Sequence, residues 1–300
     1  MTFSPITIGI SLMMISDILI VSMGALAKAL GEDISALEVA FYKSALTLIG
    51  VSALMIHKSD WSLFKTSHFK AQFFRATIGN VNAILLFWSY MLLPLGVAAT
   101  FFYAAPIFIV VQSILFLGER AGWVRWSAVL FGFVGIVLIT LPGFNEGQAN
   151  ITLFAVSIGL ITSIIAASVH ISIRYLATLG ESAFTTVFYF SLIGTIGIAV
   201  PLSYTGLKWP EGLGVLVILL GICALLSQVL KTRAYDFVEA SFVAPFRYIG
   251  LVWSVVIGYF FWDEIPSLLT VLGAVIIVSA NIIIVMRERA LKNKALKSTD

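Results

Sequence analysis

The sequence predicts an all-α membrane protein of ten transmembrane helices. Of its 300 residues, 60% are hydrophobic and only 11% are charged, and the mean hydropathy is +1.05. A helix needs about 20 apolar residues to cross a hydrocarbon core roughly 30 Å thick, and runs of that length recur along the whole chain. The placement of the basic residues and an internal repeat then predict how the helices are oriented and grouped.

Turn sequences separate the predicted spans. Pro94-Leu95-Gly96, Leu141-Pro142-Gly143 and Pro210-Glu211-Gly212 each carry the glycine and proline typical of a break between helices. The first apolar run is too long for the core of a signal peptide and lacks a basic segment before it, so we expect it to stay as a helix. The spans are expected at 6–30, 36–56, 73–93, 96–117, 123–141, 152–174, 182–203, 212–231, 238–261 and 267–286.

The basic residues predict that both termini are cytoplasmic. Loops on the cytoplasmic side of a membrane carry an excess of lysine and arginine. With a cytoplasmic N-terminus, the outer loops hold only Lys208, and Lys28, Lys43 and Arg247 fall within spans. The remaining basic residues, Arg75 and Lys231 among them, are then assigned to inner loops and the tail.

The two halves of the chain resemble each other. Residues 99–120 align with residues 244–265 at a constant offset, so that Tyr103 meets Tyr248 and Glu119 meets Glu264. Each half holds an odd number of spans, so the second half would enter the membrane in the opposite sense. Such inverted five-helix repeats are typical of secondary transporters. The predicted units are 1–145, 146–286 and a basic cytoplasmic tail, 287–300, whose alternative role is to bind anionic lipid.

Three segments resemble the EamA family of the drug/metabolite transporter superfamily. They are "LGER" at 117–120, "GWVRWSAVLFGFVGIVLITLPG" at 122–143 and "VEASFVAPFRYIGLVWSVVIGYFFWDE" at 238–264. The resemblance implies a carrier of the bacterial inner membrane with a central cavity and alternating access. Carriers of this kind take amino acids, S-adenosylmethionine, riboflavin, sugars or drugs as substrates.

The segments "EVAFYKS" at 38–44 and "APFRYIGLVWS" at 244–254 are most similar to the proteobacterial branch that includes S-adenosylmethionine carriers. That resemblance implies an amino acid or S-adenosylmethionine-like substrate. The branch often has arginine where this chain has Lys43, which keeps the charge but loses the planar fork that binds carboxylates with two hydrogen bonds.

Two cations within spans are candidate substrate anchors. In the repeat alignment Arg247 corresponds to Phe102, and Lys43 corresponds to Phe190. A cation at a helix centre costs roughly 2.5–3.5 kcal/mol on insertion scales. Since each cation is absent from the twin half, we expect it to bind a carboxylate or another anionic group in a shared cavity. The alternatives are a structural ion pair for either residue, or hydrogen bonds from Arg247 to carbonyl groups.

Asp17, near the middle of the first span, is the third charged candidate. It would bind a substrate amine, carry a coupled proton or pair with Lys43, and its alternative role is a polar contact between helices. Asn80 and Asn82 face different sides of their helix, so at most one should line a cavity, and Asn82 is our candidate. His170 is either a proton-sensing or a packing residue.

Aromatic side chains deep in the spans are candidates for shaping the cavity. Trp88, Tyr103, Tyr248 and Trp253 could enclose a planar or cationic part of a substrate, although packing between helices explains each of them equally well. Glu119 and Glu264 occupy matching helix ends and are expected to be helix-boundary or gate contacts.

Other functional classes find little support. The sequence has no HExxH, GxSxG or Walker motif, its three histidines are scattered, and it has one cysteine, so we predict no enzyme, no metal site and no cofactor. A channel would need more polar residues than the spans hold. The predicted partners are the lipid bilayer, a small-molecule substrate and possible coupling protons, with no nucleic acid, in a monomer or homodimer. Export of drugs or of other metabolites such as riboflavin is the main alternative function.

Overall fold

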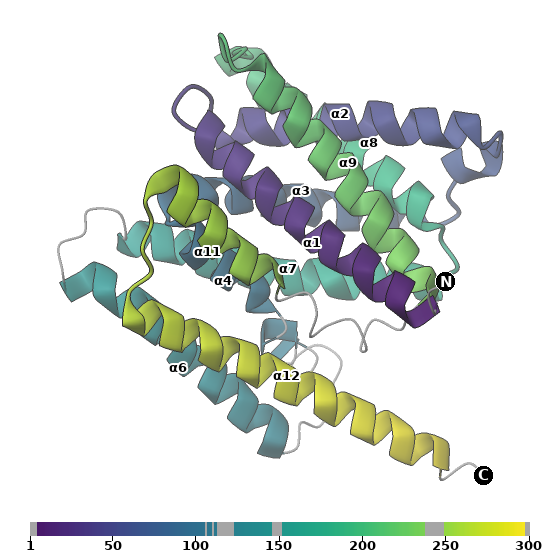
Figure 1. The fold of residues 1–300 in the computed structure, drawn as a ribbon. Helices are drawn as coiled ribbons and strands as arrows, with labels where there is room; N and C mark the ends of the chain where they lie inside the picture. The colour runs from purple at the N-terminus through teal and green to yellow at the C-terminus, as the bar shows by residue number, and fades with distance from the viewer. Residues whose placement is uncertain are drawn as a thin grey trace.

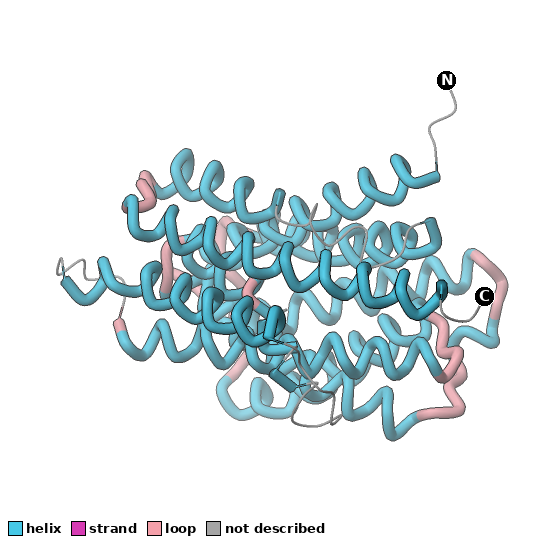
Figure 2. The backbone as a smooth tube through the Cα atoms, turned by 90° about the horizontal axis from the view of Figure 1, so that it is seen from below, coloured by secondary structure: helices cyan, strands magenta, loops and turns pink. Residues whose placement is uncertain are grey.

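A computed structural model describes residues 5–105, 107–109, 111–112, 123–145, 152–237 and 249–297. Within these ranges the chain consists of helices joined by short loops and turns, without a β-strand (Figures 1 and 2). The elements are α1 (Pro5–Leu30), α2 (Ala36–His57), the short 3-10 helix η1 (Trp61–Phe64), α3 (Phe69–Leu92), α4 (Leu95–Tyr103), α6 (Trp123–Asn145), α7 (Leu153–Thr178), α8 (Ala183–Thr205), α9 (Gly214–Phe237), α11 (Ile249–Trp262) and α12 (Leu268–Lys297).

The described helices overlap the predicted spans, and several of them extend past the predicted ends. The helix α3 begins at Phe69, so Arg75 lies inside it and only 6% of that residue is exposed. The helix α9 continues to Phe237, so Lys231 also lies in a helix. The assignment of both cations to inner loops was wrong, because each lies inside a helix and within the ends of the expected spans 73–93 and 212–231. The helix α12 likewise continues through part of the basic tail, to Lys297.

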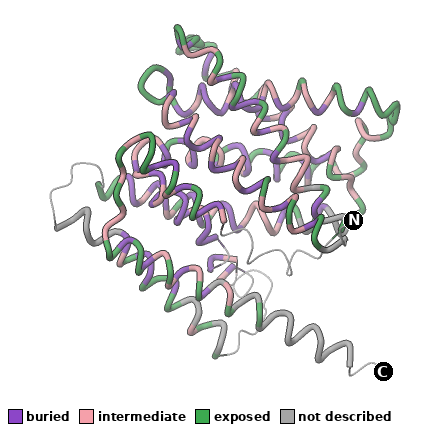
Figure 3. The backbone as a smooth tube through the Cα atoms, viewed as in Figure 1, coloured by how far each residue is buried: buried purple, intermediate pink, exposed green. Residues whose placement is uncertain are grey.

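Five described helical segments are long and apolar enough to cross a membrane. They are Thr7–Leu30, Ala36–His57, Leu153–Ile173, Ala183–Thr205 and Gly214–Lys231. The helix α3 is as long, but Lys70, Arg75 and two asparagines make it more polar. Exposed positions alternate with buried ones along the helices (Figure 3), and many of the exposed positions carry large apolar side chains. Leu130, Val137 and Phe260, for example, are 61%, 56% and 73% exposed, as expected of side chains that face lipid.

The packing brings the two halves of the chain together. The helix α1 packs on α9 while α3 packs on α7, and α2 packs on both α8 and α9 while α3 also packs on α8. The helix α4 packs on α11 and on α7, and α1 packs on α11. The helices α6 and α12 run side by side along one flank (Figure 1). Most of these contacts therefore join residues far apart in the sequence.

A glycine pair sets the close approach of α6 and α12. A Cβ atom added at Gly273 would lie 2.5 Å from the carbonyl oxygen of Gly135, and one at Gly135 would lie 2.8 Å from that of Gly273. Since each obstacle is backbone, neither helix could accept a side chain there without moving away. Small residues at such crossings are the usual means by which membrane helices pack tightly.

Candidate functional site

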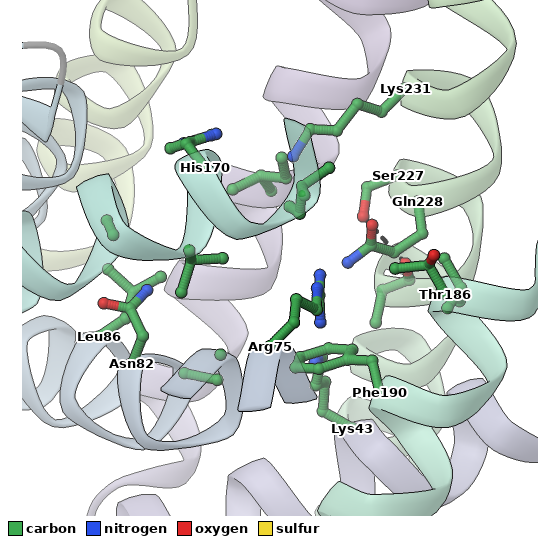
Figure 4. Close-up of a pocket in the computed structure, with 18 of the residues that line it drawn as sticks. Lys43, Arg75, Asn82, Leu86, His170, Thr186, Phe190, Ser227, Gln228 and Lys231 are labelled. Carbon is green, nitrogen blue, oxygen red and sulfur yellow. Dashed lines mark hydrogen bonds between the residues drawn. The ribbon is translucent and has the colours of Figure 1, made fainter. Parts of the chain in front are cut away.

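A cavity of about 380 Å³ lies between the two halves (Figure 4). Its walls come from α1, α2, α3, α7, α8 and α9, with Phe102 of α4. Apolar side chains form most of the lining, which is the usual composition of a small-molecule site. The polar and charged lining residues are Lys43, Arg75, Asn82, His170, Glu181, Thr186, Ser227, Gln228 and Lys231.

One face of α3 supplies much of this wall. Arg75, Gly79, Asn82 and Leu86 all line the cavity. Their spacing of four, three and four residues matches the 3.6-residue turn, so they lie on a single stripe of the helix. The sequence therefore carried a signal for Arg75, namely its helical phase with Asn82, which the prediction did not use.

Lys43 and Arg75 meet at one aromatic ring. The Nζ atom of Lys43 lies 4.0 Å from the centroid of the Phe190 ring, and the Cζ atom of Arg75 lies 4.2 Å from the same centroid (Figure 4). Lys43 is 4% exposed and Arg75 is 6% exposed. Among the described residues, no carboxylate forms an ion pair with either cation. The Nε and Nη1 atoms of Arg75 also have no hydrogen-bond partner there.

This arrangement leaves positive charge inside the bundle without a counter-charge from the described protein. Cation–π contact contributes about 0.5–2 kcal/mol, which is far less than the cost of burying an ionised group. An anion in the cavity would supply the missing charge and accept from the open donors of Arg75. The open donors of Arg75 and the two buried cations are therefore available to an anionic group.

A side chain of α3, Asn80, contacts the backbone of α8 at Phe190. The Nδ2 atom of Asn80 donates to the carbonyl oxygens of Phe190 and Ala76, at 3.0 Å and 2.8 Å. Gly79 provides the room, since a Cβ atom there would lie 3.1 Å from the Phe190 ring and 3.3 Å from Arg75 Nη1. Asn80 therefore faces α8, whereas Asn82 faces the cavity, where its Oδ1 atom has no hydrogen-bond partner among the described residues.

The other predicted site residues are distributed differently. Asp17 is fully buried beside Tyr103, whose hydroxyl donates to Asp17 Oδ1 at 3.4 Å, and neither residue lines the cavity. Trp88 is 38% exposed and packs edge-on against Phe154. Trp253 is 36% exposed, and its Nε1 atom donates to Ser22. Arg247 and Tyr248 lie outside the described residues.

A polar network links the helices at one end of the bundle. Lys28, near the end of α1, forms an ion pair with Glu264 and donates to the carbonyl oxygen of Leu93 at 3.0 Å. The second carboxylate oxygen of Glu264 accepts from the backbone N–H of Leu95 at 2.6 Å. The Lys28 ammonium also lies 5.4 Å from the ring centroid of Trp262. We call this group the Glu264 network; it ties α1, the α3–α4 turn and the α11–α12 loop together.

A second network lies at the opposite end, around Glu181 in the α7–α8 loop. Its carboxylate accepts from Thr66 at 2.7 Å and from Gln72 at 3.0 Å, and lies 3.1 Å from His68 Nδ1. Burial alone would raise the pKa of this carboxyl group, but these hydrogen bonds outweigh burial, so the pKa of Glu181 lies below its ordinary value of 4.5. The cavity reaches this end, because Glu181 and Thr186 line it.

The helical fold is shared with a protein of known structure. A solved crystal structure that is 18% identical superposes with a TM-score of 0.64, covering 94% of this chain and 98% of that chain, so the two share a fold. Residues 7–141 match the EamA-like transporter family. This match confirms the resemblance to the EamA family for the first half of the chain.

Curated relatives extend the similarity over almost the whole chain. The pseudopaline exporter of Pseudomonas aeruginosa (strain UCBPP-PA14) is 29% identical over 274 residues, which are 91% of this chain and 94% of the relative. An S-adenosylmethionine uptake transporter of Rickettsia bellii is 28% identical and covers 97% of both chains. The chain is thus a multi-pass membrane protein related to transporters rather than to enzymes.

Proposed function

We propose that this protein is a secondary transporter that moves a small polar metabolite with an anionic group across the bacterial inner membrane. The observation that carries the proposal is the pair of buried cations, Lys43 and Arg75, that line a cavity between the two halves without an acidic partner among the described residues. Retaining two such charges is costly, and an anionic substrate gives a physical reason for them.

The mechanism that we propose is alternating access by two inverted five-helix halves, with ten spans and cytoplasmic termini. The helix pairs support this proposal. If α1, α2, α3, α4 and α6 correspond to α7, α8, α9, α11 and α12, a two-fold axis exchanges the α1–α9 contact with the α7–α3 contact. The same axis exchanges α2–α9 with α8–α3 and maps the α2–α8, α4–α11 and α6–α12 pairs onto themselves.

The two networks support an assignment of gates. The Glu264 network closes the end at which α1 finishes, while the cavity reaches the end at which α3 and α8 begin. In the proposed orientation the closed end is external and the open end is cytoplasmic. Transport then requires the Glu264 network to break as the halves rock.

The substrate class follows from the lining and from the relatives. Lys43 and Arg75 engage the anionic group, and the open Oδ1 acceptor of Asn82 suits a donor such as an amine. Amino acids and S-adenosylmethionine combine both groups, and an S-adenosylmethionine uptake transporter is among the relatives. Roles for Arg247, Asp17, Tyr103, Tyr248, Trp88 and Trp253 in binding, and for protons in coupling, stay predictions.

The alternative is export of a drug or of another metabolite, and the pseudopaline exporter among the relatives supports it. Both are tested with purified protein in liposomes preloaded with unlabelled amino acids, S-adenosylmethionine or a metabolite mixture. Entry of the labelled compound is followed with and without a pH gradient. Saturable entry that internal substrate accelerates is the expected result. Entry that rises linearly with concentration and ignores internal substrate would instead indicate a channel.

A further inference from the structure

We infer that the cavity selects substrates with two negative charges, either two carboxylates or a phosphate, over substrates with a single carboxylate. This inference rests on the proposed transport function and narrows its substrate class. Its basis is that Lys43 and Arg75 lie against one ring, 4.0 Å and 4.2 Å from the centroid of Phe190. The site therefore holds two buried cations that contact the same ring (Figure 4).

A single negative charge would leave this site unbalanced. Two neighbouring cations repel each other, and the low dielectric of a protein interior strengthens that repulsion. The Phe190 ring attracts both cations but carries no net charge, so it cannot neutralise either. A monocarboxylate would neutralise one cation, and the other would remain buried without a counter-charge. A doubly charged group would neutralise both.

The hydrogen-bonding capacity of Arg75 agrees with a ligand that has several oxygen atoms. Its Nε and Nη1 atoms are buried and have no hydrogen-bond partner among the described residues, although the side chain lines the cavity. A guanidinium group binds carboxylate or phosphate oxygens through more than one N–H group, whereas an ammonium acts as a point charge. Arg75 would thus orient one oxyanion group while Lys43 balances the second charge.

The other charged residues of the lining leave the cavity with a net positive charge. Lys231 is a third cation in the wall, and Glu181 is the one carboxylate among the described lining residues. The oxygens of Glu181 already accept from Thr66 and Gln72, so it is committed to the loop network. A sulfonium or another fixed cation on the substrate would meet this excess of positive charge. We therefore expect net anionic substrates to bind more tightly than S-adenosylmethionine.

The test measures binding, by titration calorimetry, to the purified full chain at one pH and constant ionic strength. Butyrate and succinate form a matched pair of equal length with one and two carboxylates, and phenyl phosphate and inorganic phosphate test the phosphate alternative. We expect succinate or a phosphate to bind about tenfold or more tightly than butyrate. If butyrate, succinate and both phosphates bind the wild-type protein equally, the inference is refuted without any variant.

Variants locate the selectivity. Arg75→Gln and Lys43→Gln should each reduce the preference for the dianion to about threefold or less, because each leaves one cation. The matched control is Lys58→Gln, since the Lys58 ammonium lies 4.1 Å from the ring centroid of Phe184 outside the cavity lining. It should leave the preference unchanged. An equal loss in Lys58→Gln would show a diffuse charge effect and refute the assignment to the cavity.

If Arg75→Gln does not fold, Arg75→Lys keeps both charges and removes the guanidinium. It should retain the preference for dianions over butyrate but bind each dianion more weakly, and a complete loss of preference would contradict the charge argument. The binding assay is independent of flux. Dianion-selective binding without exchange in liposomes would refute transport and leave this inference standing. Exchange of monocarboxylates in liposomes, with no preference for dianions in binding, would support transport and refute this inference.

Discussion

Glu264→Gln should open the end of the bundle that we propose the Glu264 network closes. Glu264 binds Lys28 through one carboxylate oxygen and the backbone N–H of Leu95 through the other. Glutamine has nearly the same shape, and its amide oxygen can still accept from Leu95. The substitution therefore removes the charge of the network while leaving one hydrogen bond possible.

The size of the effect follows from the burial of the pair. The side chains of Lys28 and Glu264 are 14% and 17% exposed, so water screens them less than an ordinary surface pair. A hydrogen bond to a charged group contributes about 1.5–3 kcal/mol. Losing about 2 kcal/mol from the closed state would shift its equilibrium with the open state by roughly 30-fold.

A cysteine reporter beneath the network measures this shift. Ser89 is suitable, because it is 1% exposed, its hydroxyl has no hydrogen-bond partner among the described residues, and cysteine has a similar size. Cys223, which is half-buried, is first replaced by serine. The rate at which a polar thiol reagent labels Ser89→Cys should rise by roughly 30-fold when Glu264→Gln is added, in proportion to the open population.

The matched control is Glu211→Gln, which removes an exposed carboxylate from the loop before α9. It changes the charge that the reagent meets by the same amount but touches no part of the network. Labelling that stays at the starting rate in Glu264→Gln, or that rises equally in Glu211→Gln, would show that the network does not hold this end closed.

Three further predictions concern packing, pH and the ring of the site. Gly273→Ala should lower the free energy of unfolding by about 1–3 kcal/mol, because the added methyl group meets the backbone of α6. Gly197→Ala is the control, since Gly197 has open space around it and the substitution should not lower stability. Equal thermal melts for the two variants would contradict this prediction. Glu181 has a lowered pKa in the folded state, so its contribution to stability is present above pH 4.5 and is lost as the pH falls below that value. Glu181→Gln should therefore flatten the acid side of a plot of melting temperature against pH. An unchanged slope would show that Glu181 does not make this contribution. Asn80→Ala should weaken dianion binding about tenfold, since it removes the hydrogen bond from α3 to the carbonyl oxygen of Phe190. An unchanged affinity in calorimetry would show that this hydrogen bond does not position the Phe190 ring.

The helices and much of their placement were predictable from the chain. An apolar run of about 20 residues can satisfy its backbone in a bilayer only as a helix, so hydropathy locates it. Helix ends were less predictable. Phe69 begins α3 before the apolar run starts, and α12 continues well past the apolar segment, because polar residues extend a helix at no cost once they reach water.

The candidate site was predictable only in part. Lys43 stood out because it lies within an apolar run, and the structure places it in the cavity lining. Arg75 lies close to the helix start and has the ordinary appearance of a residue that anchors a helix at the cytoplasmic face. Asp17 was an open candidate to pair with Lys43, and the structure places it beside Tyr103 instead.

Hydropathy and residue spacing were enough to predict a helical membrane protein with a cation within its second span. It also placed Arg75 and Asn82 on one stripe of α3, since helical phase depends on spacing alone. The tertiary structure was needed to show that this stripe lines the cavity and that Lys43 and Arg75 both contact the ring of Phe190 on α8. Periodicity shows which residues share one face of a helix. The helix that this face packs against depends on side-chain packing between segments more than 100 residues apart.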